Sequence, residues 1–97
     1  MYTATMNYPV KPDAMEDFVA LWEEKVLDLA IRQEGFVRMQ ILTRENEAMA
    51  MGTWDDKSSA EAFMTLGPFK RLMEAAKEYL SGDPRPTVWS LAAFAAR

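Results

Sequence analysis

A row of polar side chains near the amino terminus is the sharpest candidate for chemistry in this sequence. Thr3, Thr5 and Asn7 alternate along residues 2–8, a run rich in aromatic and β-branched residues that is predicted to be a strand. Alternation places the three on one face, and we expect that face to pack against the helices. An amide there could hydrogen-bond a substrate hydroxyl or a developing oxyanion. An asparagine that bonds backbone in the turn before Pro9 is the open alternative.

Trp54 is the second candidate catalytic residue because it ends a predicted strand. Its ring could wall a pocket for a flat substrate, and its indole N–H could donate a hydrogen bond. A role as a core or dimer aromatic is the alternative, and Trp22 is interpreted as core. The expected substrate-binding residues are Thr3, Thr5, Phe63, Phe69, Met73 and Tyr79, with Tyr8 and Arg38 as further possible polar contacts.

Two helical segments and four strands are expected to position these side chains. Apolar residues at helical spacing predict a first helix that Asp13 caps and that Gly35 ends. A second helix is predicted to open at Ser58 or Ser59, and Gly67-Pro68 interrupts it. The predicted strands cover residues 2–8, 36–43, 48–54 and 87–94, and the first helix covers about 13–33.

Composition excludes several classes of function. The chain has 97 residues, which is the size of a single domain over 1–97, and its net charge of −4 disfavours nucleic acid or an anionic membrane as partner. It has no cysteine and no histidine, so disulfides and thiol chemistry are excluded, and we expect neither a metal nor a cofactor. No signal peptide or membrane span is recognisable, and a cytoplasmic location is expected.

The pattern of apolar residues predicts that both faces of the sheet are covered. No strand has a clean polar face; for example, residues 36–43 are expected to place Phe36 with Arg38 on one face and Met39 with Ile41 on the other. Helices can cover only one face, so we expect a homodimer that pairs the other faces, with Trp89 in that interface. A monomer with scattered exposed apolar residues is the alternative.

The chain resembles the antibiotic biosynthesis monooxygenase domain family, a branch of the dimeric α/β-barrel group. The segments that carry the resemblance are Val10-Lys11-Pro12 before a helix with Phe18, Glu34-Gly35-Phe36, Gly52-Thr53-Trp54-Asp55-Asp56, Ala60-Glu61-Ala62-Phe63 and Gly67-Pro68-Phe69-Lys70. Each segment is weak alone, but their order and spacing cover nearly the whole chain. The element order β-α-β-β-α-β independently predicts an α+β, ferredoxin-like fold with a four-stranded antiparallel sheet.

The resemblance implies a homodimer with sheets back to back and a pocket in each subunit between sheet and helices. Members oxidise quinols or polycyclic phenols with molecular oxygen, often without metal or flavin, so a cofactor-independent monooxygenase acting on a small aromatic substrate is expected. The alternatives are a non-catalytic small-molecule-binding or stress-related protein and, less favoured, a haem-degrading enzyme. Of the haem-cleaving residues only Asn7 matches, because Phe63 and Met73 stand where that branch has tryptophan and histidine.

Overall fold

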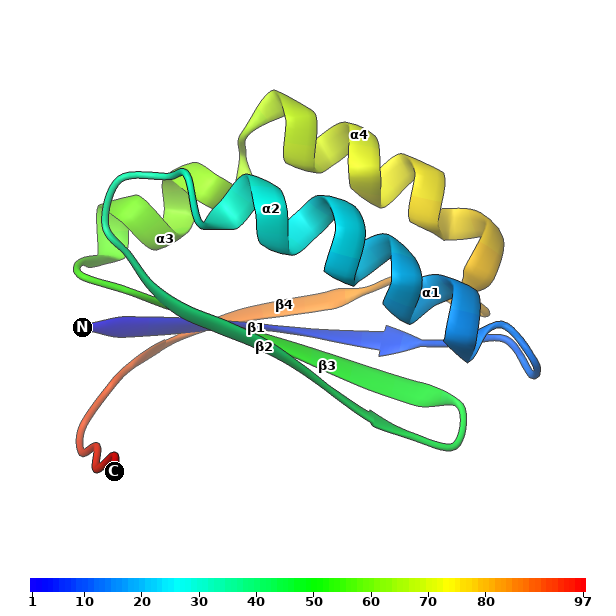
Figure 1. The fold of residues 1–97 in the computed structure, drawn as a ribbon, viewed down its shortest axis with the longest axis horizontal. Helices are drawn as coiled ribbons and strands as arrows, with labels where there is room; N and C mark the ends of the chain where they lie inside the picture. Colours follow the sequence, from blue (N-terminus) through cyan, green and yellow to red (C-terminus); the bar gives the residue numbers. More distant parts are fainter.

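One antiparallel sheet with helices on a single face forms the domain, which a computed structural model describes over residues 1–97. Figure 1 shows all helices on one side of the sheet and the carboxyl terminus on the other. The strands are β1 (Tyr2–Pro9), β2 (Phe36–Arg44), β3 (Glu47–Trp54) and β4 (Arg85–Ser90), and they lie in the order β2-β3-β1-β4. The predicted ferredoxin-like α+β fold is therefore confirmed.

The helical layer is made of two interrupted helices. The first consists of α1 (Met15–Leu21), a π-helical turn η1 (Trp22–Val26) and α2 (Leu27–Ala30). The second consists of α3 (Lys57–Met64), α4 (Gly67–Ala76) and a 3₁₀ turn η2 (Lys77–Tyr79). Its break lies at Thr65 and Leu66, just before the predicted Gly67-Pro68, which forms the first turn of α4. No helix is both long enough and apolar enough to cross a membrane.

The helix starts differ from the predicted ones. Asp13 has a φ of 66°, which places it in the turn before the helix, and α1 begins after Ala14 without a side-chain cap. Asp56, rather than either serine, caps α3: its Oδ1 accepts hydrogen bonds from the Ser59 backbone N–H at 2.8 Å and the Ser58 hydroxyl at 2.9 Å. These bonds lower the pKa of Asp56. The first helix ends at Ala30, earlier than the predicted residue 33, and Gly35, with a φ of 81°, lies in the turn that leads into β2 rather than at the helix end.

Aromatic contacts show which face of the sheet meets the helices. The Tyr8 ring on β1 lies 4.9 Å from that of Phe18 on α1. The Trp54 ring on β3 lies 5.1 Å from that of Phe63 on α3. Because side chains alternate along a strand, Thr3, Thr5 and Asn7 point to the opposite, open face. The expectation that this row faces the helices was therefore wrong.

A bulge in β2 changes which of its residues reach the core. Phe36 pairs with Trp54, but Arg38 pairs with the next residue, Thr53, so Val37 is an extra residue on β2. The Phe36 ring consequently packs on the Trp54 ring at 5.6 Å instead of lying on the face of Arg38. The predicted grouping of Phe36 with Arg38, Gln40 and Leu42 was wrong for this reason.

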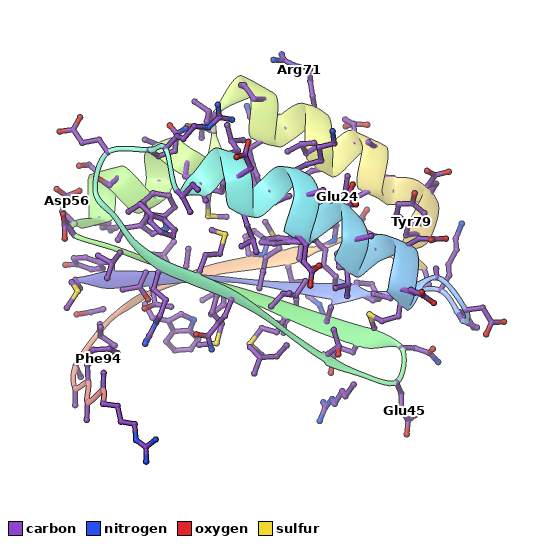
Figure 2. The ribbon with its side chains drawn as sticks, in the orientation of Figure 1. Glu24, Glu45, Asp56, Arg71, Tyr79 and Phe94 are labelled. Carbon is purple, nitrogen blue, oxygen red and sulfur yellow. The ribbon has the colours of Figure 1, made fainter.

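The open face of the sheet carries apolar side chains with no cover from the chain's own helices. Leu42, Met49 and Trp89 are 47%, 37% and 58% exposed. The last strand ends at Ser90 rather than in the predicted region of residue 94, and Phe94 lies on this side of the sheet (Figure 2). The Arg38 guanidinium sits 4.5 Å from the centre of the Phe94 ring.

Candidate functional site

A small apolar cavity lies between the sheet and the helices, with a volume of about 30 Å³. Strand residues form its floor and helix residues its roof. Its lining residues are Ala4, Thr5, Met6, Tyr8, Trp22, Met39, Gly52, Trp54, Phe63, Met64 and Phe69. Tyr8, Trp22 and Trp54 are each no more than 2% exposed, so this part of the domain is shielded from water.

Three aromatic residues of the predicted site meet in this cavity. The Trp54 and Phe63 rings are 5.1 Å apart, and the Phe63 and Phe69 rings are 4.7 Å apart, which gives a continuous aromatic wall from β3 to α4. Gly52 makes room for that wall, because a Cβ at this position would come within 2.8 Å of Met39 Cε and 3.1 Å of Trp54 Nε1. The aromatic wall is suited to one face of a flat substrate.

Tyr8 and Trp22 bring two polar side chains to a lining that is otherwise almost wholly apolar. The Tyr8 hydroxyl donates a hydrogen bond to Met73 Sδ at 3.2 Å, so the predicted residue Met73 contacts the cavity indirectly. Burial raises the pKa of Tyr8 well above its usual range, and the nearby Trp22 indole offsets part of that rise. The phenol therefore stays protonated at neutral pH and can act as a donor.

Of the remaining predicted site residues, only Thr5 borders the cavity. Thr3 Oγ1 is hydrogen-bonded to Thr53 Oγ1 at 3.0 Å. Thr5 borders the cavity, but its hydroxyl accepts from Trp89 Nε1 at 3.1 Å on the open face. Tyr79, in η2, is half-buried and is not among the cavity residues; Figure 2 shows it at the opposite end of the domain from Asp56. The neighbouring Glu78 raises its pKa.

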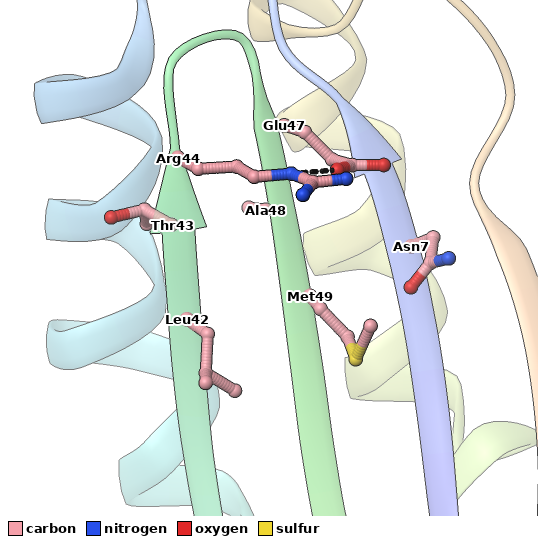
Figure 3. Close-up of a pocket in the computed structure, with 7 residues that line it drawn as sticks. All are labelled: Asn7, Leu42, Thr43, Arg44, Glu47, Ala48 and Met49. Atoms are coloured by element: carbon pink, nitrogen blue, oxygen red, sulfur yellow. Dashed lines mark hydrogen bonds and ion pairs between the residues drawn. The ribbon is translucent and has the colours of Figure 1, made fainter.

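Asn7 borders a hollow on the open face, not the helix-side cavity. This hollow has a volume of about 390 Å³ and lies between Leu42 and Met49, with the ion pair of Arg44 and Glu47 at one end (Figure 3). Asn7 Oδ1 is buried there with no hydrogen-bond partner. Asn7 and Trp54 therefore stand on opposite faces of the sheet, and one ligand in one subunit cannot contact both side chains.

Sequence reasoning gave Trp22 no role beyond packing and named Tyr8 only as a possible contact. Both residues fit the apolar pattern of their elements, and the sequence carries no sign that their polar atoms meet. No group of three or more acidic side chains lies close enough together to hold a metal ion.

Comparisons with known proteins agree with this architecture. The family model described as "Antibiotic biosynthesis monooxygenase" matches residues 1–75. A protein of Natronomonas pharaonis named "putative heme-binding protein" is 35% identical over 86 residues, which cover 86% of this chain. The chain spans only 14% of that relative's length.

Solved structures with similar folds include two oxygenases from Streptomyces. SnoaB of Streptomyces nogalater, a cofactor-independent oxygenase, has a TM-score of 0.79 and 17% identity, covering 96% of this chain and 94% of that chain. The ActVA-Orf6 monooxygenase of Streptomyces coelicolor, in complex with nanaomycin D, has a TM-score of 0.79 and 18% identity, covering 99% of this chain and 92% of that chain. At these identities the likeness establishes the fold alone.

Proposed function

The chain belongs to the antibiotic biosynthesis monooxygenase family, and from that premise we propose that it oxidises a phenol or quinol with molecular oxygen in the helix-side cavity. One observation carries the proposal: Trp54 lies 1% exposed at the end of β3, against an aromatic wall that borders a small apolar cavity between sheet and helices. A dry cavity with a donor in its wall is what this chemistry requires of a protein.

The reaction needs little from the protein beyond shelter and orientation. An ionised phenol passes one electron to oxygen, the resulting pair recombines to form a carbon–oxygen bond, and loss of water from the hydroperoxide leaves a quinone. One oxygen atom enters the product and the other leaves as water. The Trp54 indole N–H hydrogen-bonds the substrate oxygen as negative charge develops on it. Water or the acidity of the substrate accounts for the proton, because the chain has no histidine and Tyr8 stays protonated.

The proposal includes a homodimer formed through the open faces of two sheets. The exposed Leu42, Met49 and Trp89 form the apolar part of that face. A second subunit would also place atoms near Asn7 Oδ1, which has no partner within one chain although it is buried. Each subunit keeps its own cavity on the helix side of the sheet. One face of the sheet therefore serves dimerisation and the other serves substrate binding.

Oxygen consumption tests the proposed activity directly. The purified protein, stripped of metal and flavin, is expected to consume oxygen above the background rate with at least one member of a panel of quinols and polycyclic phenols. Quinone formation, followed by absorbance, should match oxygen loss in a one-to-one ratio. A protein that binds panel members but never exceeds the uncatalysed rate would be a small-molecule-binding protein, the main alternative function.

Replacing Asn7 by alanine separates the two faces as candidate sites. Because Asn7 lies on the open face, we expect the N7A variant to keep kcat/KM within about threefold of wild type, which is under about 1 kcal/mol of transition-state stabilisation. Oxygen uptake is measured at a concentration where both proteins are dimeric by sedimentation. A hundredfold loss of kcat/KM in a folded N7A dimer would show that Asn7 is catalytic, as the sequence predicted, and would place the reaction on the open face.

Haem binding is the second candidate, and only the name of the Natronomonas relative favours it. The residues of the cavity do not fit haem. Met73, the one thioether in the position of the haem ligand, already accepts a hydrogen bond from the Tyr8 hydroxyl, and the chain has no histidine to take its place. When haem is titrated into the protein, we expect its Soret band to stay where it is for free haem, whereas a saturable shift of that band would support this function instead.

A further inference from the structure

Asn7 carries the one side-chain N–H on the open side of the two central strands. The residues on this side of β1 and β3 are Thr3, Thr5, Asn7, Pro9, Glu47, Met49, Met51 and Thr53. Asn7 Oδ1 is shielded from water and has no hydrogen-bond partner. Buried polar groups in folded proteins nearly always have partners. The centre of the open face therefore holds an amide that the chain itself leaves unsatisfied.

Most other polar side chains of this face already have partners within the chain. Three hydrogen bonds use them: Trp89 Nε1 to Thr5 Oγ1, Arg44 Nε to Glu47 Oε1, and Thr3 Oγ1 with Thr53 Oγ1. Gln40, Thr87 and Arg85 make no such bond, but they are exposed on the edge strands β2 and β4. A second sheet stacked on this face buries the central strands most deeply. The edge side chains then keep their access to water, whereas Asn7 loses it.

The open face has the size and the charge pattern of an interface between two copies. The molecule measures 34 Å along its longest axis, which follows the strands in Figure 1, and 22 Å along the viewing direction, across the sheet. Such a footprint is close to the roughly 800 Å² that each partner buries in a standard interface. Arg38, Arg44 and Arg85 stand on the edge strands, around the central Met49 and Met51. A charged rim around an apolar centre is typical of protein interfaces.

We propose that the two copies of Asn7 meet on the two-fold axis of the dimer and form a reciprocal pair of amide hydrogen bonds. In a two-fold interface only a side chain on the axis meets its own copy. A carboxamide suits that position because it both donates and accepts, so each Nδ2 donates to the Oδ1 of the other copy. Facing sheets lie about 10 Å apart, roughly the span of two asparagine side chains joined in this way. This inference rests on the proposed homodimer.

The amide of Asn7 can reach a second copy with little movement. Figure 3 shows its Oδ1 on the side of Met49 and its Nδ2 on the side away from Met49. The last torsion of asparagine has broad minima, so the amide can turn toward a second copy without a shift of β1. Hollows of about 390 Å³ and 380 Å³ flank Asn7, the first lined by Leu42 and the second by Trp89. Side chains of the second copy fit into these hollows beside the amide pair.

The amide pair sets the register of the two sheets. Methionine side chains adapt to many packings, so Met49 and Met51 alone would let the sheets slide over one another. A buried amide penalises every register that leaves it unpaired, as a single polar residue does in coiled coils. Asn7 therefore contributes specificity to the dimer more than affinity.

Asn7→Asp tests the pairing because it keeps the shape of the side chain and removes the donor. Two carboxylates that face each other on the axis repel, so we expect the Kd of the N7D dimer to rise at least about a hundredfold by sedimentation velocity. Gln40→Glu is the matched control: it makes the same amide-to-carboxylate change at the edge of the face, and the Kd should change less than about fivefold. An Asn7 that bonds an arginine of the second copy would instead give a tighter N7D dimer. An unchanged or lower Kd for N7D overturns the inference.

Cross-linking locates the axis in a chain that has no cysteine of its own. Asn7→Cys, treated with a short cross-linker that joins two thiols, is expected to give a covalent dimer. Gln40→Cys and Thr87→Cys are the controls, because they lie on opposite sides of β1 and an axis through Asn7 can pass near only one of them. At least one control should therefore stay unlinked.

An N7C protein that stays unlinked while sedimentation shows it to be dimeric overturns the inference, and so does linkage of both controls. Near-UV circular dichroism checks that each variant is folded, and the N7D and Q40E pair carries the test should N7C fail to dimerise. Neither measurement depends on turnover. A protein that consumes no oxygen can still show the amide pair, and a protein that oxidises quinols can still lack it.

Discussion

Replacing Trp54 by phenylalanine is expected to lower kcat/KM for quinol oxidation by about a hundredfold, with little change in KM. The substitution keeps an aromatic ring against Phe63 and Phe36 but removes the indole N–H. Loss of one preorganised donor to a developing oxyanion typically costs about 10²- to 10³-fold in rate. The donor acts on charge that appears only as the reaction proceeds, so the loss falls on kcat.

Phenylalanine is the appropriate replacement because alanine would test the fold instead of the chemistry. Trp54 is among the largest fully buried side chains, and truncating such a residue to alanine costs about 3–5 kcal/mol, a large part of a small domain's stability.

Oxygen uptake at saturating and limiting quinol gives kcat and KM separately. The Trp89→Phe variant, which loses an exposed indole, should retain the wild-type rate. A folded W54F variant with wild-type kcat would exclude Trp54 as the donor.

The order of elements and most strand positions could be predicted from the sequence because both follow from local patterns. Alternation marks strands and 3.6-residue spacing marks helices, and Gly35 and Gly67-Pro68 are strong local signals. Alternation divides the residues of β1 into two sets correctly. It does not say which set faces the helices. Either face is compatible with the set Tyr2, Ala4, Met6 and Tyr8, and either face is also compatible with the set Thr3, Thr5 and Asn7. The partners of Tyr8, Phe18 and Trp22, decide the matter, and they come from another element.

The remaining errors also arise from interactions between segments. The bulge at Val37 becomes visible only once β2 is paired with β3, so Phe36 was assigned to the wrong face. The approach of the Trp22 indole to the Tyr8 hydroxyl depends on the distance between η1 and β1, about which neither segment carries information. Trp54 was named for its place at the end of a strand, and Phe63 and Phe69 for the apolar side of the second helix; only the resemblance to a family implied a pocket between sheet and helices in which they could meet.

Strand pairing explains why the open face of the sheet is suited to a second subunit. Met49 on β3 pairs with Asn7 on β1 and with Leu42 on β2, so these three side chains form a row across the sheet. Two of the three are apolar and exposed, and the Asn7 Oδ1 atom between them and β4 is buried without a partner. A two-fold pairing brings the same row from each subunit into one interface.

The Met49→Glu variant is therefore expected to be monomeric where the wild type is dimeric, with a dimer Kd at least about a thousandfold higher. A two-fold interface contains the substitution twice, and an unpaired carboxylate taken out of water costs several kcal/mol. In the monomer Met49 is partly exposed, so the variant should keep its free energy of unfolding within about 0.5 kcal/mol of the wild-type value.

Sedimentation velocity over a range of concentrations measures the Kd of the dimer. Ile31→Glu, at a residue 60% exposed at the end of α2, is the control and should remain dimeric. An M49E protein that dimerises like wild type would place the interface elsewhere and leave the open face without its proposed cover.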